Sequence, residues 1–204
     1  MAFSNNNIVN IIAKPIQHQQ SLYKPPIQQY DLRSSNIIVV PRSAVGCEPS
    51  GTLGEDPRQK PTNLFPVVTQ VLKSERPALD VFGSDWETCD GTAVRDYIHV
   101  VDLARGHIAA LAAAEERPAE MAFRAYNLGT GRGSTVNQVV ESMDKAAGRP
   151  IPVRMAGRRE GDVGVCVADT GRAERELGWR TGMSLDECAR DTWRCIRGAV
   201  VVGV

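Results

Sequence analysis

The 204-residue sequence lacks an excess of charge of either sign, because Lys+Arg and Asp+Glu both number 24. This balance gives no support for binding to nucleic acid or to a membrane surface. The sequence also lacks any apolar run near the roughly 18 residues that would suggest a membrane span. We therefore expect neither a nucleic-acid partner nor a membrane partner.

Cysteine is present but without paired spacing, since the count is odd and no CxxC pair occurs. Disulfide frameworks and zinc sites both need closer, paired spacing. We predict reduced thiols in a cytoplasmic protein, each a small packing or surface residue. A mitochondrial address is an alternative, because Asp31 is the only acid before Ala44, but arginine is scarce there. The five cysteines are Cys47, Cys89, Cys166, Cys188 and Cys195.

Common metal and catalytic motifs are absent as well. The three histidines, His18, His99 and His107, do not stand at metal-ligand spacing from one another or from cysteines and acids. No HExxH, GxSxG or P-loop sequence occurs. The sequence therefore predicts no metal site and no serine-hydrolase or P-loop chemistry.

The chain changes character near Ala44. Residues 1–44 are dominated by Asn, Gln, Ser and Pro, and carry too little apolar surface to offset chain entropy. We expect this segment to be low-complexity and disordered, apart from one strand at 36–40. Residues 45–204 are expected to form the folded domain.

After Ala44, short strands alternate with helices, which is typical of an α/β fold. Pro66 in a first helical turn, a Ser184 to Glu187 capping box and a Ser134 cap mark helix starts. The expected helices are 63–75, 102–114, 134–147, 170–178 and 184–197. The expected strands are 79–82, 95–100, 125–128 and 151–154.

One glycine-rich loop, Gly129-Thr-Gly131-Arg-Gly133, lies between a predicted strand and a predicted helix. That is the context of a phosphate-cradling loop. It lacks the glycine spacing of a dinucleotide fingerprint, and no acid follows about 20 residues later to bind a ribose. We therefore favour a tight strand-to-helix turn.

Two arginine motifs leave alternatives open. In Arg95-Asp-Tyr-Ile-His99, the arginine could present its donor fork to a phosphate, or could form a surface pair with Asp96. In Arg158-Arg-Glu-Gly-Asp162, two arginines could clamp an anion, whereas the residues alone favour a solvated charge cluster.

Seven ordered motifs lie between about Gly46 and Arg197. They are Ser50-Gly-Thr-Leu-Gly-Glu-Asp-Pro57, Thr62-Asn-Leu-Phe-Pro66, Val81-Phe-Gly83, Asp90-Gly-Thr-Ala-Val-Arg-Asp-Tyr-Ile-His-Val100, Tyr126-Asn-Leu-Gly-Thr-Gly131, Arg158-Arg-Glu-Gly-Asp162 and Glu176-Leu-Gly-Trp179. Taken together, these motifs resemble the C-terminal half of UDP-glucose 4-epimerases, of the extended short-chain dehydrogenase/reductase superfamily. The resemblance implies the substrate-binding portion of that α/β fold, with most of the Rossmann domain absent and residual Rossmann elements at about 101–128.

The resemblance also implies a UDP-hexose site. Asn63 and Leu64 would contact the nucleotide sugar, and Asp80, Val81 and Phe82 would wall the uracil. Asp80 departs from the residue usual in the family, which weakens that one assignment.

The resemblance assigns the diphosphate to Arg95 and Arg159, whose forks suit phosphate oxygens. Asp162 would accept a hydrogen bond from the ribose. Cys166 would lie near the hexose, where its small side chain would leave room for an N-acetyl group.

The family uses NAD to interconvert UDP-galactose and UDP-glucose in galactose metabolism, and its members can form homodimers. The NAD turn GxxGxxG and the catalytic Tyr-x-x-x-Lys pair do not occur in this sequence. We therefore expect this chain alone neither to bind NAD nor to turn over substrate. Two alternatives are a non-catalytic UDP-sugar-binding module or fragment, and another nucleotide-sugar dehydratase or decarboxylase of the same superfamily.

A structural consequence follows from the missing half. In the family, the helix from Asp102 and the strand from Ala125 complete the sheet of the NAD domain. We expect their partner strands to be absent here, both elements to expose apolar surface, and the chain alone to be marginally stable.

Overall fold

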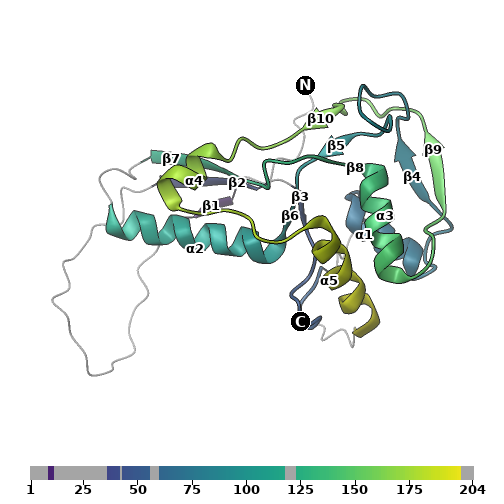
Figure 1. Cartoon of the computed structure of the whole chain (residues 1–204), viewed down its shortest axis with the longest axis horizontal. Coiled ribbons are helices and arrows are strands. Elements are labelled where there is room, and N and C mark those ends of the chain that lie inside the picture. The colour runs from purple at the N-terminus through teal and green to yellow at the C-terminus, as the bar shows by residue number, and fades with distance from the viewer. Residues whose placement is uncertain (1–8, 12–35, 42, 56–59, 118–122, 199–204) are drawn as a thin grey trace.

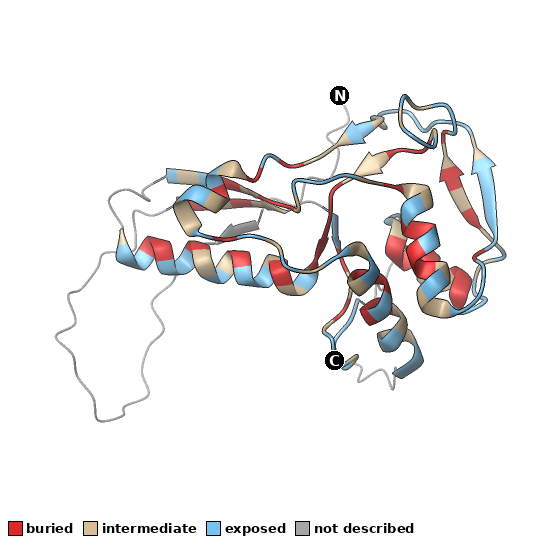
Figure 2. Cartoon of the chain, in the orientation of Figure 1, coloured by how far each residue is buried: buried red, intermediate tan, exposed pale blue. Residues whose placement is uncertain are grey.

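The computed structural model describes residues 9–11, 36–41, 43–55, 60–117 and 123–198. Two groups of elements are visible in Figure 1. The sheet lobe contains β1 (Val9–Ile11), β2 (Asn36–Pro41), β7 (Phe123–Leu128), α2 (Val100–Glu116) and α4 (Gly171–Leu177). The helix lobe contains α1 (Leu64–Leu72), α3 (Val136–Ala147), α5 (Leu185–Gly198), β4 (Leu79–Phe82) and β9 (Val153–Ala156). Each lobe has its own buried cluster, as the red ribbon of Figure 2 shows.

The sheet of the first lobe has the order β1-β2-β7. Strand β2 pairs in parallel with β7 over six residues and antiparallel with β1. The strand predicted at 36–40 is confirmed, one residue longer. The prediction that β7 lacks a partner strand is wrong, because β2 supplies one. Pairing uses backbone groups, so a segment outside the family motifs can still complete a ladder.

The apolar surface expected on these elements is present. One face of the sheet packs Val39, Tyr126 and Leu128 against α2 and α4. Phe123, at the start of β7, is 64% exposed, and Ile108 on α2 is 66% exposed. Parallel strands are usually covered on both faces, so this surface is unusual for a finished α/β sheet.

The prediction that 1–44 is disordered outside 36–40 is wrong for Val9–Ile11 and for Ser43 and Ala44, because backbone pairing places them in β1 and in the strand Ser43–Val45. Residues 1–8, 12–35 and 42 of that segment lie outside the described residues.

Helix α2 lies very close to the sheet because Gly106 has no side chain. A Cβ atom at Gly106 would lie 2.5 Å from Leu128 Cδ1 and 3.0 Å from the Trp179 ring. The small residues Ala110 and Ala113 continue this buried face. The indole N–H of Trp179 donates to the Asp102 carbonyl at 3.1 Å, which ties the segment after α4 to α2.

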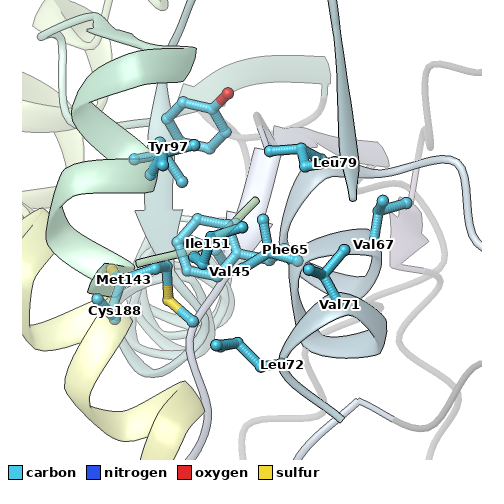
Figure 3. Close-up of a cluster of buried hydrophobic side chains, with 14 of the residues drawn as sticks. Val45, Phe65, Val67, Val71, Leu72, Leu79, Tyr97, Met143, Ile151 and Cys188 are labelled. Carbon is cyan, nitrogen blue, oxygen red and sulfur yellow. The ribbon is translucent and has the colours of Figure 1, made fainter. Parts of the chain in front are cut away.

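The core of the helix lobe is shown in Figure 3. Its side chains come from α1, α3, α5, β4, the segment before β9, and the strands that carry Val45 and Tyr97, which lie far apart in the sequence. Helix α1 begins one residue later than predicted and ends at Leu72. Ser74 follows with a left-handed φ of 62°, which ends the helix before Pro77. Strand β4 has the predicted bounds, whereas β9 starts two residues later than expected.

Local capping explains the other helix boundaries. Thr135, and not the predicted Ser134, is the N-cap of α3, and it forms a capping box with Gln138. Ser134 stands one residue before the cap and pairs with Arg95 as part of β8 (Ser134–Thr135). The predicted capping box of α5 is confirmed, since Ser184 and Glu187 exchange hydrogen bonds.

Short strands run between the two lobes. Strand β3 (Ser43–Val45) pairs with β6 (Tyr97–His99), and β5 (Val94–Arg95) lies between β8 and β10 (Val165–Cys166). The single strand predicted at 95–100 is therefore two strands, interrupted at the buried Asp96. Helix α2 then starts at Val100, two residues earlier than predicted, because the His99 ring accepts from the Val101 N–H and caps it.

Candidate functional site

The end of β4 and the loop before β10 bring together three residues that the sequence assigned to substrate binding. The Arg159 guanidinium lies 4.3 Å from the centre of the Phe82 ring. Its Nε donates to Asp162 Oδ2 at 3.0 Å. These side chains are about 49% and 23% exposed, so the pair faces solvent. We call Phe82, Arg159 and Asp162 the Arg159 cluster.

Asp85 and Trp86, which the sequence analysis did not select, hold the Arg158–Asp162 loop in place. The Arg158 guanidinium lies 3.9 Å from the centre of the Trp86 ring. Arg158 also donates to the side chain and the carbonyl of Asp85, at 2.8 and 2.7 Å. The Trp86 indole N–H donates to the Phe82 carbonyl at 3.3 Å. The sequence did offer one signal for this role, a tryptophan three residues after Gly83. Its partner Arg158 is distant in the chain, so the contact could not be predicted.

Arg95 and Cys166 form a second group. They are direct partners in the parallel pairing of β5 with β10, and both are half-buried. Arg95 Nη1 donates to the Val94 carbonyl at 2.8 Å. The Val94 N–H donates to the Gly164 carbonyl at 2.8 Å, which connects this group to the segment that follows Asp162. Strands β5 and β10 lie beside each other in Figure 1.

The other residues of β4 alternate between core and surface. Val81 is 1% exposed and belongs to the core, so only its backbone can face a ligand. Asp80 is on the outer face with Phe82 and pairs with Arg154 at 2.6 Å. The hydrogen bond from Arg154 lowers the pKa of the Asp80 carboxyl from its ordinary value. A carboxylate that is already paired is a poorer wall for uracil than a free apolar side chain.

Asn63 and Leu64 are at the start of α1. The exposed Asn63 side chain makes no capping hydrogen bond, whereas Leu64 packs against the core of the helix lobe. Among the described residues, no recorded hydrogen bond or ion pair joins them to the Arg159 cluster. The structure thus brings together five of the nine predicted residues, in two adjacent groups.

The glycine-rich loop after β7 is not a free phosphate cradle. Asp96, only 1% exposed, accepts from the Thr130 N–H at 2.8 Å and from the Gly131 N–H at 3.1 Å. The Ala168 N–H donates to the same carboxylate at 3.1 Å. A Cβ atom on Gly129 would lie 2.5 Å from Asp96 Oδ2. The tight strand-to-helix turn favoured from the sequence is confirmed, and the alternative surface pair between Arg95 and Asp96 is wrong.

The described histidines have structural partners. His99 is fully buried, and its Nε2 lies 3.3 Å from Asp191 Oδ2 while Nδ1 caps α2. His107 Nδ1 lies 2.8 Å from the Leu103 carbonyl. Across the described ranges, no three His, Cys, Asp or Glu residues are grouped as a metal site would need. None of the helices in those ranges combines the length and apolar character needed to cross a membrane.

A hollow of about 270 Å³ lies in the sheet lobe beside β7. Its charged lining residues pair with one another, since Glu176 lies 3.7 Å from Arg124 and 3.9 Å from Arg172. None of the nine predicted site residues lines it. We assign it no ligand.

The fold and these motifs define a class of protein. A sequence profile described as "GDP-mannose 4,6 dehydratase" matches residues 51–192, which is more than half of the chain. The chain belongs to this family, within the extended short-chain dehydrogenases/reductases. Within it, the similarity is to UDP-glucose 4-epimerases: 54% identity over 149 residues with that of Cyamopsis tetragonoloba and 52% over 149 with that of Homo sapiens.

These matches cover 73% of this chain but only 42% of either relative, so the chain spans less than half the length of the curated relatives. The UDP-glucose 4-epimerase structure from Stenotrophomonas maltophila, with bound NAD and formylated UDP-arabinopyranose, superposes with a TM-score of 0.74 at 39% identity. The superposition covers 78% of this chain and 46% of the Stenotrophomonas maltophila chain. The Bifidobacterium longum enzyme in complex with NAD+ and UDP gives 0.70 at 41%, with the same coverage.

These findings confirm the predicted resemblance and the predicted fold class. The chain is a mixed α/β portion of a UDP-glucose 4-epimerase-like fold, and it corresponds to less than half of both solved relatives named above.

Proposed function

We propose that this chain binds the UDP part of a UDP-hexose, as the nucleotide-sugar-binding portion of a protein that interconverts UDP-galactose and UDP-glucose. The observation that carries the proposal is the Arg159 cluster, in which an aromatic ring, a guanidinium and a carboxylate meet at the surface. The aromatic ring can stack on a base, the guanidinium can bind a diphosphate, and the carboxylate can accept a hydrogen bond from a ribose hydroxyl.

The charges of the cluster support an exchange of partners on binding. The Arg159–Asp162 pair is partly exposed, and exposed pairs of this kind contribute little to stability. Bidentate bonds from arginine to phosphate are stronger, so a diphosphate can replace Asp162 as the partner of Arg159. Asp162 is then free to accept from a ribose hydroxyl. Arg95, half-buried on the neighbouring β5, supplies the second cation.

The sugar end of the proposed site is near Cys166. Its small, half-buried side chain stands opposite Arg95 in the pairing of β5 with β10. This position supports acceptance of a UDP-N-acetylhexosamine as well as UDP-glucose, and both nucleotide sugars belong in the binding test.

NAD is the cofactor bound in these solved relatives, but the residues that the structure describes do not fit it. The glycine-loop N–H groups that could receive a pyrophosphate already donate to the buried Asp96. The sequence has no Tyr-x-x-x-Lys pair to move the proton of a sugar hydroxyl. We therefore assign this chain binding and orientation of the nucleotide sugar, and no hydride step.

Calorimetry of the 204-residue chain with UDP tests the proposal. Arg159→Gln should weaken UDP binding by about tenfold or more, because it removes a charge-assisted phosphate contact. Arg154→Gln is the matched control, since Arg154 is an exposed arginine on the neighbouring β9 that pairs with Asp80. Absence of UDP binding by the unchanged chain would refute the proposal, as would equal losses in the two variants.

A second candidate is suggested by the family description, which names an enzyme of a GDP-sugar. Titration with GDP distinguishes the two. We expect UDP to bind more tightly, in keeping with the relatives at more than 50% identity. Tighter binding of GDP would favour the dehydratase-like alternative.

A further inference from the structure

Two cysteines from opposite ends of the domain have adjacent sulfur atoms. Cys47 is buried two residues after the end of β3, and Cys195 is half-buried on α5. A Cβ atom built on Gly54 would lie 2.3 Å from Cys195 Sγ and 2.9 Å from Cys47 Sγ. The two sulfurs therefore cannot be farther apart than these distances combined. Residue 54 covers both thiols at once, which only a residue without a side chain can do here.

A second observation supports the same contact. A Cβ atom on Gly46 would lie 3.4 Å from Cys188 Cα on α5, and the Cys195 thiol and the Thr192 hydroxyl of that helix both shift the pKa of the Cys47 thiol. Thr192 itself donates to the Cys188 carbonyl one turn earlier in that helix. The segment around Cys47 is thus in contact with the face of α5 that carries Cys195.

We propose that Cys47 and Cys195 are a redox modification site, oxidised to an intramolecular disulfide by a low-molecular-weight organic disulfide such as glutathione disulfide. The inference does not rest on nucleotide binding, because neither cysteine is among the residues of the proposed UDP site.

The reaction balances in two exchanges. The Cys195 thiolate attacks one sulfur of glutathione disulfide, which forms a mixed disulfide and releases one glutathione thiolate that takes up a proton. Cys47 then loses its proton and attacks the Cys195 sulfur, which releases the second glutathione. Two protein thiols are oxidised, and one glutathione disulfide is reduced to two thiols.

The order of these steps follows from exposure. Cys195 is the more accessible thiol, so it meets the oxidant first. Burial, together with the neighbouring Cys195, raises the pKa of the Cys47 thiol to about 12. Cys47 is therefore a poor first nucleophile, and acts as the resolving thiol once the mixed disulfide is beside it. The second exchange should accelerate as the pH rises.

The bridge would connect β3 to the last helix of the described chain, across most of the sequence. A cross-link that closes so long a loop restricts the unfolded ensemble strongly. For a chain of this size we expect the melting temperature to rise by on the order of 10 °C, and to return when dithiothreitol reduces the bond.

The experiment uses the purified 204-residue chain treated with glutathione disulfide, followed by non-reducing peptide mass mapping and thermal melts. We expect a Cys47–Cys195 cross-linked peptide and a reversible rise in melting temperature. Cys195→Ser should abolish both, and Cys47→Ser should abolish both while leaving the mixed disulfide on Cys195. Cys89→Ser, at an exposed cysteine, is the matched control and should behave as the unchanged chain.

Three outcomes would overturn the inference. One is a mixed disulfide at Cys195 that never resolves, another is a cross-link that joins other cysteines, and the third is an equal thermal shift in oxidised Cys195→Ser. Cys195→Ser keeps the test decisive even if Cys47→Ser does not fold, because Cys195 is only half-buried.

Discussion

Trp86 shows how a residue without a ligand role can set the geometry of the proposed site. Its ring receives the Arg158 guanidinium on one side, and its N–H bonds the Phe82 carbonyl. It packs so closely on Gly164 that a Cβ atom there would lie 2.9 Å from the ring. Trp86 is therefore a positioning residue for the loop that carries Arg159 and Asp162.

We predict that Trp86→Leu weakens UDP binding several-fold, because the Arg158–Asp162 loop loses its stacking and hydrogen-bonding partner. Trp86→Phe keeps a ring for Arg158 and should lose less. Calorimetry measures the affinity, and a thermal melt separates loop misplacement from unfolding. UDP affinity that is unchanged in Trp86→Leu would contradict the assignment.

Asp96 and Val81 show the limit of prediction for single residues. Asp96 was expected as a possible surface partner of Arg95, yet it is buried among backbone N–H groups from two distant loops. Val81 was assigned to the uracil wall, yet its side chain is in the core. The residue type alone could not decide either position, because both depend on which segments pack around them.

At the scale of elements, the start of α3 depends on Thr135. Its hydroxyl accepts from the Gln138 N–H and donates to Asp90, and its own N–H donates to the Gln138 side-chain oxygen. We predict that Thr135→Ala lowers the free energy of unfolding by about 1–2 kcal/mol, because a capping residue is lost. Urea unfolding measures the loss.

Ser134→Ala is the matched control for this cap, since Ser134 precedes the cap and contributes through its backbone to β8. It should change the free energy of unfolding by less than about 0.5 kcal/mol. If both variants lost the same free energy of unfolding, Thr135 would not be the N-cap of α3, and the sequence-based assignment to Ser134 would stand.

The same cap predicts a dependence on acid pH. Burial alone would raise the pKa of Asp90, but hydrogen bonds from Thr135 and Thr92 to the ionised carboxylate outweigh it and lower the pKa from 3.8. The stabilisation is therefore complete above the unfolded-state pKa, and is lost as the pH falls through the lower folded-state value.

We predict that Asp90→Asn melts at a lower temperature than the unchanged chain near neutral pH. The difference should shrink as the pH falls below the ordinary aspartate pKa of about 4 and through the lowered pKa of Asp90. Melting curves across this window provide the measurement. A gap that stays constant or widens in acid would refute the ionised role of Asp90.

At the scale of the whole molecule, β2 changes the picture of an isolated half. It gives β7 a partner strand and buries Val39 in the core of the sheet lobe. Phe123 and Ile108 nevertheless remain exposed, and the chain spans less than half of its curated relatives. We predict marginal stability for the 204-residue chain, with a melting temperature near or below about 50 °C.

A single cooperative transition far above that temperature would contradict the prediction of marginal stability. The same preparation, supplied with NAD+ and UDP-galactose, should form no UDP-glucose, because the chain lacks the Tyr-x-x-x-Lys pair. Measurable interconversion by the pure chain would overturn our assignment of binding without a hydride step.

The sequence alone determined the features that depend on neighbours a few residues apart. These include the α/β alternation, the bounds of β4, the capping box of α5 and the tight turn after β7. The ordered motifs also determined the family, because the order and spacing of motifs can be read from the sequence without knowing how the chain packs. Hydrogen bonds within three or four residues form from local sequence, so they are predictable from it.

Only the tertiary structure decided the features that join distant segments. These features are the pairing of β2 with β7 and the hydrogen bonds from the glycine-loop N–H groups to Asp96. They also include the contact of Arg158 with the Trp86 ring and the proximity of Cys47 to Cys195. Each of these contacts joins residues that many different packings could have separated. Burial and long-range pairing select one packing, and no spacing within the sequence specifies it in advance.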